Sequence, residues 1–119
     1  MIEDEQDIWN LYKMLFEREG IEVAWIAEDG KTAIEKIDEI KEKLQDVVFL
    51  IDQRIPEKAG LEVAKRIIEL APSISDQIII ASADDTISQE ELKKLGIKYF
   101  LQKPFSLEKL LEIVEKINK

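Results

Sequence analysis

The sequence contains no cysteine and no histidine among its 119 residues. Their absence excludes disulfides, a thiol nucleophile, a histidine general base and the usual zinc-binding sets. No apolar run approaches the roughly 20 residues that span a bilayer, and no secretory signal precedes the first expected helix. We therefore expect a cytoplasmic protein with no membrane association, whose chemistry depends on carboxylates, hydroxyls and lysines.

The chain also has fewer basic than acidic residues. The chain has 17 Lys and Arg against 26 Asp and Glu, which gives a net charge of −9. This balance argues against nucleic acid as a direct partner, because phosphate backbones are bound by Lys and Arg. It fits a site in which acids surround a cation. The apolar content of 45 % argues against disorder, and the length allows one domain, residues 1–119.

The segment from Val47 to Glu62 organises the rest of the chain. Five apolar residues, Val47 to Ile51, precede Asp52 without a polar break, which is typical of a strand buried on both faces of a parallel sheet. Pro56 stops the strand, and Gly60 allows a turn into a helix. The segment therefore predicts a strand, an acid at its carboxyl end, a loop and a helix.

Helical and strand patterns alternate along the whole chain. Strands are expected at 21–26, 47–51, 78–81 and 97–101, and a very short one at the start. Amphipathic helices are expected between them and at 107–117. The second helix should begin at a Thr32–Glu35 capping box and extend to Leu44, and the fourth should begin at a Ser88–Glu91 box. This alternation predicts βα units with a parallel sheet and right-handed crossovers.

Residues that could bind a ligand or react lie at the expected carboxyl ends of these strands. They are Glu3 and Asp4, Asp52, Ser82 and Lys103. Ligands of open α/β sheets bind at that edge, so these side chains should converge there. Clustered carboxylates favour a hard cation such as Mg²⁺.

The chain resembles the receiver domains of two-component response regulators over nearly its whole length. Residues 52–62 fit the pattern Asp-x-x-(Met/Ile)-Pro-x-x-x-Gly-(Leu/Met)-Glu, and the acids, Ser and Lys occur in the family's order. Glu3 occupies a place where the family more often has Asp. The resemblance implies a flavodoxin-like (βα)5 three-layer sandwich with strand order 2-1-3-4-5, truncated or rearranged at its first strand.

The resemblance also implies a function. A sensor histidine kinase would phosphorylate Asp52 in a Mg²⁺-dependent reaction, with Ser82 and Lys103 assisting. Glu3, Asp4, Asp52 and the Arg54 backbone carbonyl would bind the metal, and Lys103–Pro104 would be a cis peptide. Ser82 and Phe100 would switch the surface formed by the fourth helix, fifth strand and fifth helix, which controls an output domain or effector protein. The chain would be no enzyme beyond its own phosphorylation and dephosphorylation.

Two other functional classes stay open at this point. The chain could be a phosphorylation-independent interaction module that keeps the fold without the switch. It could also be a small flavodoxin-like or phosphatase-like enzyme, although Asp52-Gln53-Arg54 lacks the Asp-x-Asp of aspartate-based phosphatases and no Gly-rich phosphate loop is present. Acetyl phosphate with Mg²⁺ separates the three classes, which predict a labile adduct, no adduct and turnover respectively.

The start of the chain is short for such a fold, because only Met1 and Ile2 precede Glu3. Strands usually have about five residues, and a shortened central strand leaves backbone groups of both neighbours unpaired. The stub could pair with its neighbours and leave a gap, the neighbours could close up, or two chains could exchange elements. We expect a weakened N-terminus with possible homodimerisation, poorly anchored Glu3 and Asp4, and weaker Mg²⁺ binding than in a form with upstream apolar residues.

Overall fold

The computed structural model describes residues 1–53, 59–83 and 89–118. Helices and strands follow one another along the chain, with two short 3-10 helices labelled η. Among the described residues, no helix combines the length and the apolar character needed to span a membrane. The elements are α1 (Gln6–Arg18), α2 (Gly30–Glu39), η1 (Lys41–Asp46), β1 (Phe49–Asp52), α3 (Gly60–Leu70), η2 (Pro72–Gln77), β2 (Ile78–Ser82), α4 (Gln89–Leu95), β3 (Tyr99–Gln102) and α5 (Leu107–Asn118).

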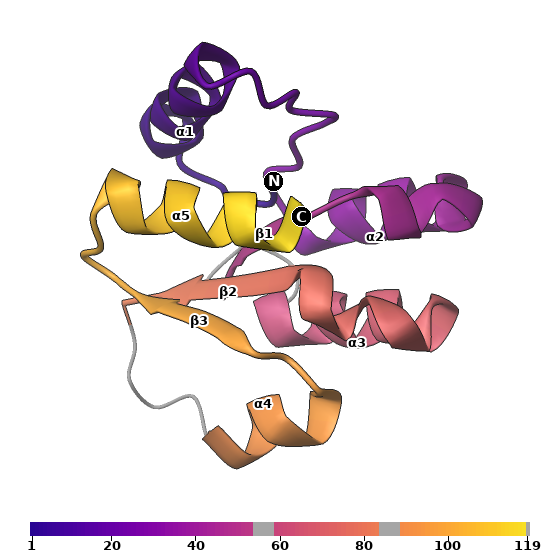
Figure 1. The fold of residues 1–119 in the computed structure, drawn as a ribbon. Coiled ribbons are helices and arrows are strands. Elements are labelled where there is room, and N and C mark those ends of the chain that lie inside the picture. Colours follow the sequence, from indigo (N-terminus) through magenta and orange to yellow (C-terminus); the bar gives the residue numbers. More distant parts are fainter. Residues whose placement is uncertain (54–58, 84–88, 119) are drawn as a thin grey trace.

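The strands β1, β2 and β3 form a parallel sheet in that order (Figure 1). The register pairs Asp52 with Ala81 and Ser82 with Gln102, so the strands end close together. Every residue of β1 and β2 is buried, as expected for apolar strands covered on both faces. The predicted strands at 47–51, 78–81 and 97–101 are thus confirmed, with bounds shifted by one or two residues.

Helices cover both faces of this sheet and give the predicted three-layer α/β fold. On one face, α1 and α5 pack on Leu50, Ile79 and Leu101. On the other, α2, α3 and α4 pack with both 3-10 helices on Phe49, Ile51 and their neighbours. Figure 1 shows α5 above the plane of β2 and β3, with α3 and α4 below it. The two faces therefore have separate apolar cores, and the sheet edge between them is left for polar groups.

The N-terminal part of the sheet differs from the prediction. Among the described residues the strand expected at 21–26 is not formed, and the first strand is reduced to Ile2, which makes single parallel bridges to Ala27 and Ile51. These bridges put Ile2 between its two neighbours, as the expected order requires, but a five-stranded sheet is not formed. The physical reason is a missing partner, because the residues that pair with this segment are Met1 to Glu3, and on that side they bond only to Trp25 and Ala27 among the residues described.

Two local predictions about helices were wrong. The N-cap of α2 is Asp29, whose carboxylate accepts from the Thr32 N–H at 2.7 Å, and not Thr32 itself. A carboxylate is a stronger cap than a hydroxyl because it is charged and lies at the positive end of the helix. The helix ends at Glu39, and Leu44 lies in the separate 3-10 helix η1 (Lys41–Asp46). The Ser88 cap lies outside the described residues.

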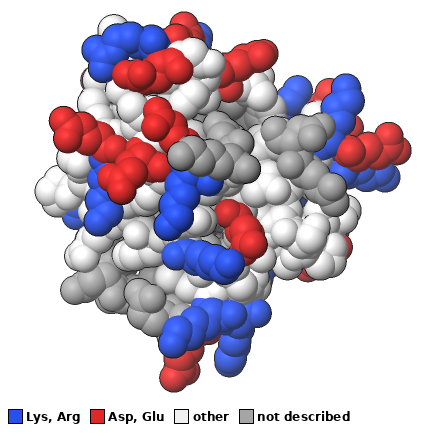
Figure 2. All heavy atoms as spheres, viewed as in Figure 1, with Lys and Arg blue, Asp and Glu red and all other residues white. Residues whose placement is uncertain are grey.

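Charged side chains cover the surface outside these cores. On the face shown in Figure 2, acidic and basic residues are interspersed and no large area carries one sign alone. An exposed ion pair, Arg66–Asp38 at 3.0 Å, joins α3 to α2. Glu3 and Asp52 differ from these surface charges because they are buried.

Candidate functional site

Asp52, Ser82 and Lys103 meet at the carboxyl edge of the sheet, as the sequence predicted. Asp52 ends β1, Ser82 ends β2, and Lys103 follows β3. The Lys103 ammonium lies 2.9 Å from Asp52 Oδ2, and the Lys103 N–H donates to the Ser82 carbonyl at 2.8 Å. Asp52 is 8 % exposed and Ser82 is fully buried. Three adjacent strands thus aim a carboxylate, a hydroxyl-bearing residue and an ammonium at one point.

Glu3 belongs to the same site and is well anchored. Its backbone N–H donates to the Ala27 carbonyl. The Ile2 N–H donates to the Leu50 carbonyl, and the Ile2 carbonyl accepts from the Asp52 N–H. The Glu3 side chain is 3 % exposed and lies 3.5 Å from the Lys103 ammonium. The expectation of a poorly anchored Glu3 was therefore wrong, because Ile2 holds the segment to β1 while Met1 and Glu3 hold it to Ala27. Asp4 is exposed.

Burial changes the proton affinity of these groups. The pKa of Glu3 rises to about 8, first because burial disfavours its charge and next because the Asp52 carboxylate is adjacent. Burial lowers the pKa of Lys103, but its hydrogen bond and attraction to Asp52 outweigh that effect and the net direction is upward. The neighbouring Lys103 lowers the pKa of Glu3, but burial and Asp52 raise it by more, so Glu3 keeps a proton at neutral pH.

The acids at this edge fit a divalent cation. Glu3, Asp4 and Asp52 each offer a carboxylate oxygen, and these oxygens lie within 4.8 Å of one another. Neither buried Glu3 oxygen has a hydrogen-bond partner within the described part of the chain. A hard cation such as Mg²⁺ prefers oxygen ligands and would also offset the charges that keep Glu3 protonated. The Arg54 carbonyl, expected as a further ligand, lies outside the described residues.

Gly60 and Gln53 hold the start of α3 close to the end of β1. A Cβ at Gly60 would lie 2.5 Å from the Asp52 carbonyl oxygen, so only glycine allows α3 to begin this close to β1. The Gln53 carbonyl accepts from the Gly60 N–H at 2.9 Å, and its side-chain oxygen accepts from the Leu61 N–H at 2.8 Å. Gln53 thus caps α3, a role that sequence reasoning missed because the cap is distant in sequence from the helix.

Two aromatic residues lie beside the site. Phe100, the expected switch residue, is half-buried and pairs with Ile80. Side chains alternate along a strand, so Phe100 lies on the same face of the sheet as Ser82. Tyr12 is buried and stacks on Phe105, with 6.0 Å between the two ring centroids. Burial raises the pKa of Tyr12, and the charges of Lys103, Glu3 and Asp52 also act on it. The helical spacing of Tyr12 predicts a buried position but not which charged residues lie near it.

The fold and the site together define a class, the α/β signalling domains with an acidic, lysine-containing edge. The sequence matches the response regulator receiver domain family over residues 1–115, and the chain belongs to this family of two-component signalling. The Lys103–Pro104 peptide is cis, as the resemblance implied.

Known proteins are similar over the whole chain. The chemotaxis protein CheY of Listeria monocytogenes is 32 % identical over 119 residues, which are all of this chain and 96 % of that protein. CheY of Thermotoga maritima is 29 % identical over all of this chain and 95 % of its own. Among solved structures, the receiver domain of the Francisella response regulator 1452 is 32 % identical with a TM-score of 0.79, covering 98 % of this chain and 92 % of its own.

Proposed function

We propose that this receiver domain takes a phosphoryl group from a sensor histidine kinase onto Asp52 and uses the modified state to control an output partner. The observation that carries this proposal is the 2.9 Å contact between Asp52 and Lys103 beside two further acids. A lone aspartate at a strand end needs neither a lysine nor a buried acid next to it. An aspartate that receives a dianionic group needs cations on both sides.

Each residue has a distinct task in this reaction. The Asp52 carboxylate oxygen attacks phosphorus, and the bond from phosphorus to the donor's nitrogen breaks with its electron pair going to that nitrogen. Lys103 stabilises the charge that spreads over the phosphoryl oxygens, and the Ser82 hydroxyl donates to one of them. Glu3, Asp4 and Asp52 would hold Mg²⁺, which supplies positive charge to the incoming group when bound.

The response is a change in population between two packings of the same fold. Movement of Ser82 toward the phosphoryl group would vacate space on its face of the sheet, and Phe100 lies half-buried on that face. The surface that would change is that of α4, β3 and α5. Phe100 has no hydroxyl, so its position can be transmitted by packing but not by a hydrogen bond.

Acetyl phosphate with Mg²⁺ tests the proposal. Intact-mass spectrometry should show one added phosphate that is labile to hydroxylamine and absent in Asp52→Asn. Asp7→Asn, which changes an exposed acid in the first turn of α1, is the matched control and should be modified like the wild type. An adduct that persists in Asp52→Asn would refute the assignment. No adduct at all would favour a phosphorylation-independent interaction module.

A further inference from the structure

The outer surface of α1 carries two exposed apolar side chains. Leu11 is 48 % exposed and Met14 is 70 % exposed, and they are the large apolar residues left exposed in the described part of the chain. They are three positions apart in one helix, so their side chains are neighbours on its surface. A single exposed apolar side chain is ordinary, whereas two adjacent ones form a patch that a partner could cover.

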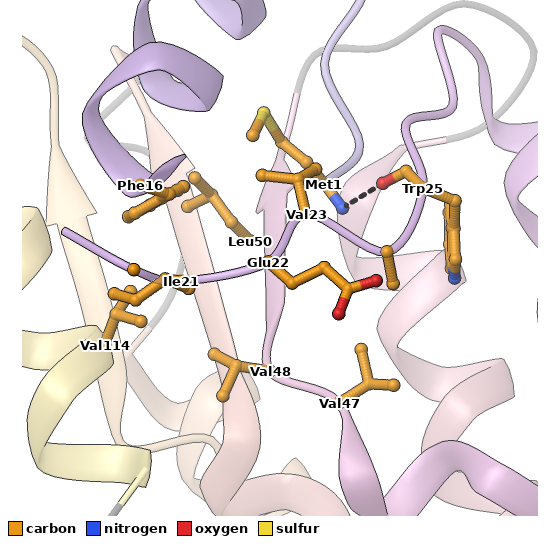
Figure 3. A pocket seen from close by; sticks show the side chains of 12 residues that line it. Met1, Phe16, Ile21, Glu22, Val23, Trp25, Val47, Val48, Leu50 and Val114 are labelled. Carbon is orange, nitrogen blue, oxygen red and sulfur yellow. Dashed lines mark hydrogen bonds between the residues drawn. The ribbon is translucent and has the colours of Figure 1, made fainter. Parts of the chain in front are cut away.

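This patch is separate from the buried face of α1. The buried face packs on the sheet through Tyr12, Leu15 and Phe16. Figure 3 shows Phe16 directed from α1 toward Leu50 of β1. In Figure 1, α1 lies at the margin of the molecule, with α5 below it. The outer surface of the helix is therefore open to another molecule.

Charges of opposite sign flank the patch. Asp7 lies in the first turn of α1 and Arg18 in the last turn, and both are exposed. Successive residues differ by about 100° around a helix axis, so the acid, the two apolar residues and the base lie within about 60° of one another. We call Asp7, Leu11, Met14 and Arg18 the outer ridge of α1.

The outer ridge is complementary to itself when one copy is reversed. Four positions separate Asp7 from Leu11, and four separate Met14 from Arg18. In an antiparallel pair of α1 helices, Leu11 of each copy would therefore lie level with Met14 of the other. Asp7 of each copy would lie level with Arg18 of the other. This alternation of four and three positions is also the spacing with which helices pack side by side.

We propose that the outer ridge of α1 binds a second copy of this chain in an antiparallel contact with two-fold symmetry. Two apolar layers would form its centre, and two ion pairs between Asp7 and Arg18 would close its ends. The same surface serves both copies, as two-fold symmetry requires. Because the chain has a net charge of −9, two copies repel each other unless a local charge pattern of this kind brings them together. The proposal does not depend on phosphorylation at Asp52.

The position of the charges also favours two-fold pairing over a parallel contact. A parallel pair would place Asp7 against Asp7 and Arg18 against Arg18, which is repulsive at both ends. Beside the ridge, Glu17 pairs with Lys13 of the same helix at 3.8 Å, so this flank adds no net charge. The helix dipole alone favours an acid in the first turn and a base in the last turn, but it does not account for the exposed apolar residues between them.

The contact is small, so the dimer should be weak. Stable interfaces bury about 1,200–2,000 Å², and one ridge of a helix covers less. We therefore expect a dissociation constant on the order of 100 µM. Sedimentation velocity of the full chain, at concentrations on both sides of this value, should show a monomer that converts to a dimer.

Substitution of the apolar centre tests which surface is used. Met14→Asp puts a charge into both apolar layers and should raise the dissociation constant at least about tenfold. The Met14 side chain is largely exposed in the single chain, so the variant should stay folded, which circular dichroism checks. Lys65→Asp changes an exposed residue on α3 and should leave the dissociation constant within about twofold of that of the wild type.

Reversal of the charges tests the antiparallel arrangement. Asp7→Arg sets two bases side by side at each end, and Arg18→Asp sets two acids there, so each should weaken the dimer about tenfold. The double variant Asp7→Arg/Arg18→Asp restores both ion pairs with the signs exchanged and should recover most of the wild-type affinity. Lys65→Asp is also the matched control for the charge change of Arg18→Asp.

Three results would overturn the proposal. A wild type that stays monomeric at every concentration would leave the outer ridge to another partner. A dimer that Met14→Asp does not weaken would use a different surface. Single charge reversals without effect, or a folded double variant that dimerises no better than either single reversal, would exclude the antiparallel arrangement. If the double variant does not fold, Met14→Asp and the two single reversals decide.

Discussion

Replacing Glu3 by glutamine tests the electrostatics of the buried acid cluster. The pKa of Glu3 rises from 4.5 to about 8, with burial as the main cause and Asp52 as the second. A raised acid pKa means that the folded state holds a proton that the unfolded state releases above about pH 4.5. Stability from this group is therefore fully present below pH 4.5 and is lost as the pH rises through 8. The shift corresponds to at most roughly 5 kcal/mol.

Glu3→Gln removes this titration and keeps the shape of the side chain. Without divalent cations, the variant should resemble the wild type near pH 5 and be more stable by several kcal/mol near pH 9, a large share of typical domain stability. Mg²⁺ should raise the stability of the wild type at high pH and that of the variant much less. The measurement is urea unfolding from pH 4.5 to 9, with EDTA or with Mg²⁺.

Met1 contributes a pH dependence of opposite sign. Burial lowers the pKa of its amino group from 8.0 to about 5, so this contribution is present above pH 8 and is lost as the pH falls through 5. The wild type and Glu3→Gln both contain Met1, so the contribution of Met1 cancels in the difference between their free energies of unfolding. A difference that does not change between pH 5 and 9 would refute the reasoning on Glu3.

Two further substitutions test the rest of the site. Lys103→Ala should stay folded and keep metal binding, and acetyl phosphate should phosphorylate its Asp52 more slowly because Lys103 no longer stabilises the phosphoryl oxygens. The phosphorylated variant should lack the response of the α4–β3–α5 surface, followed by amide chemical shifts, and an unchanged response would contradict this role. Gly60→Ala should lower the free energy of unfolding by about 2–3 kcal/mol, because its Cβ would meet backbone atoms of Asp52 and Gln53. Gly20→Ala is the control. The Gly20 backbone has φ +77°, but no atom lies within 4 Å of an added Cβ, so this variant should lose only the conformational cost of about 1–2 kcal/mol. Equal losses of unfolding free energy at both sites would contradict the packing argument.

Sequence patterns predicted the parts of this protein that depend on local apolar periodicity. The runs before Asp52 and Ser82 are long enough to specify buried strands, and the carboxyl-edge rule then brings Asp52, Ser82 and Lys103 together. Leu11 also fits the apolar spacing of α1, but it is 48 % exposed. Helical spacing predicts an apolar stripe along α1, but the width of the surface that packs on this stripe decides which residues at its margin are buried.

Other features depend on partners that a pattern cannot reveal. Residues 21–26 have the composition of a strand, but a strand also needs a neighbour to bond with, and Met1 and Ile2 supply little of one. The capping of α3 by Gln53 depends on how closely Gly60 approaches β1. The raised pKa of Glu3 depends on burial, which one bridging residue makes possible.

That bridging residue has a thermodynamic consequence. Ile2 bonds to β1 through Leu50 and Asp52, and the next residue, Glu3, bonds to Ala27 and carries one carboxylate of the acid cluster. A cation at this cluster would find its ligands in place only while these backbone bonds hold Glu3. Cation binding and the pairing of the N-terminal segment are therefore linked, and linkage is reciprocal. Whatever factor the pairing adds to cation affinity, the cation adds to the stability of the pairing, so a bound cation should slow hydrogen exchange of the Ile2 and Glu3 amides.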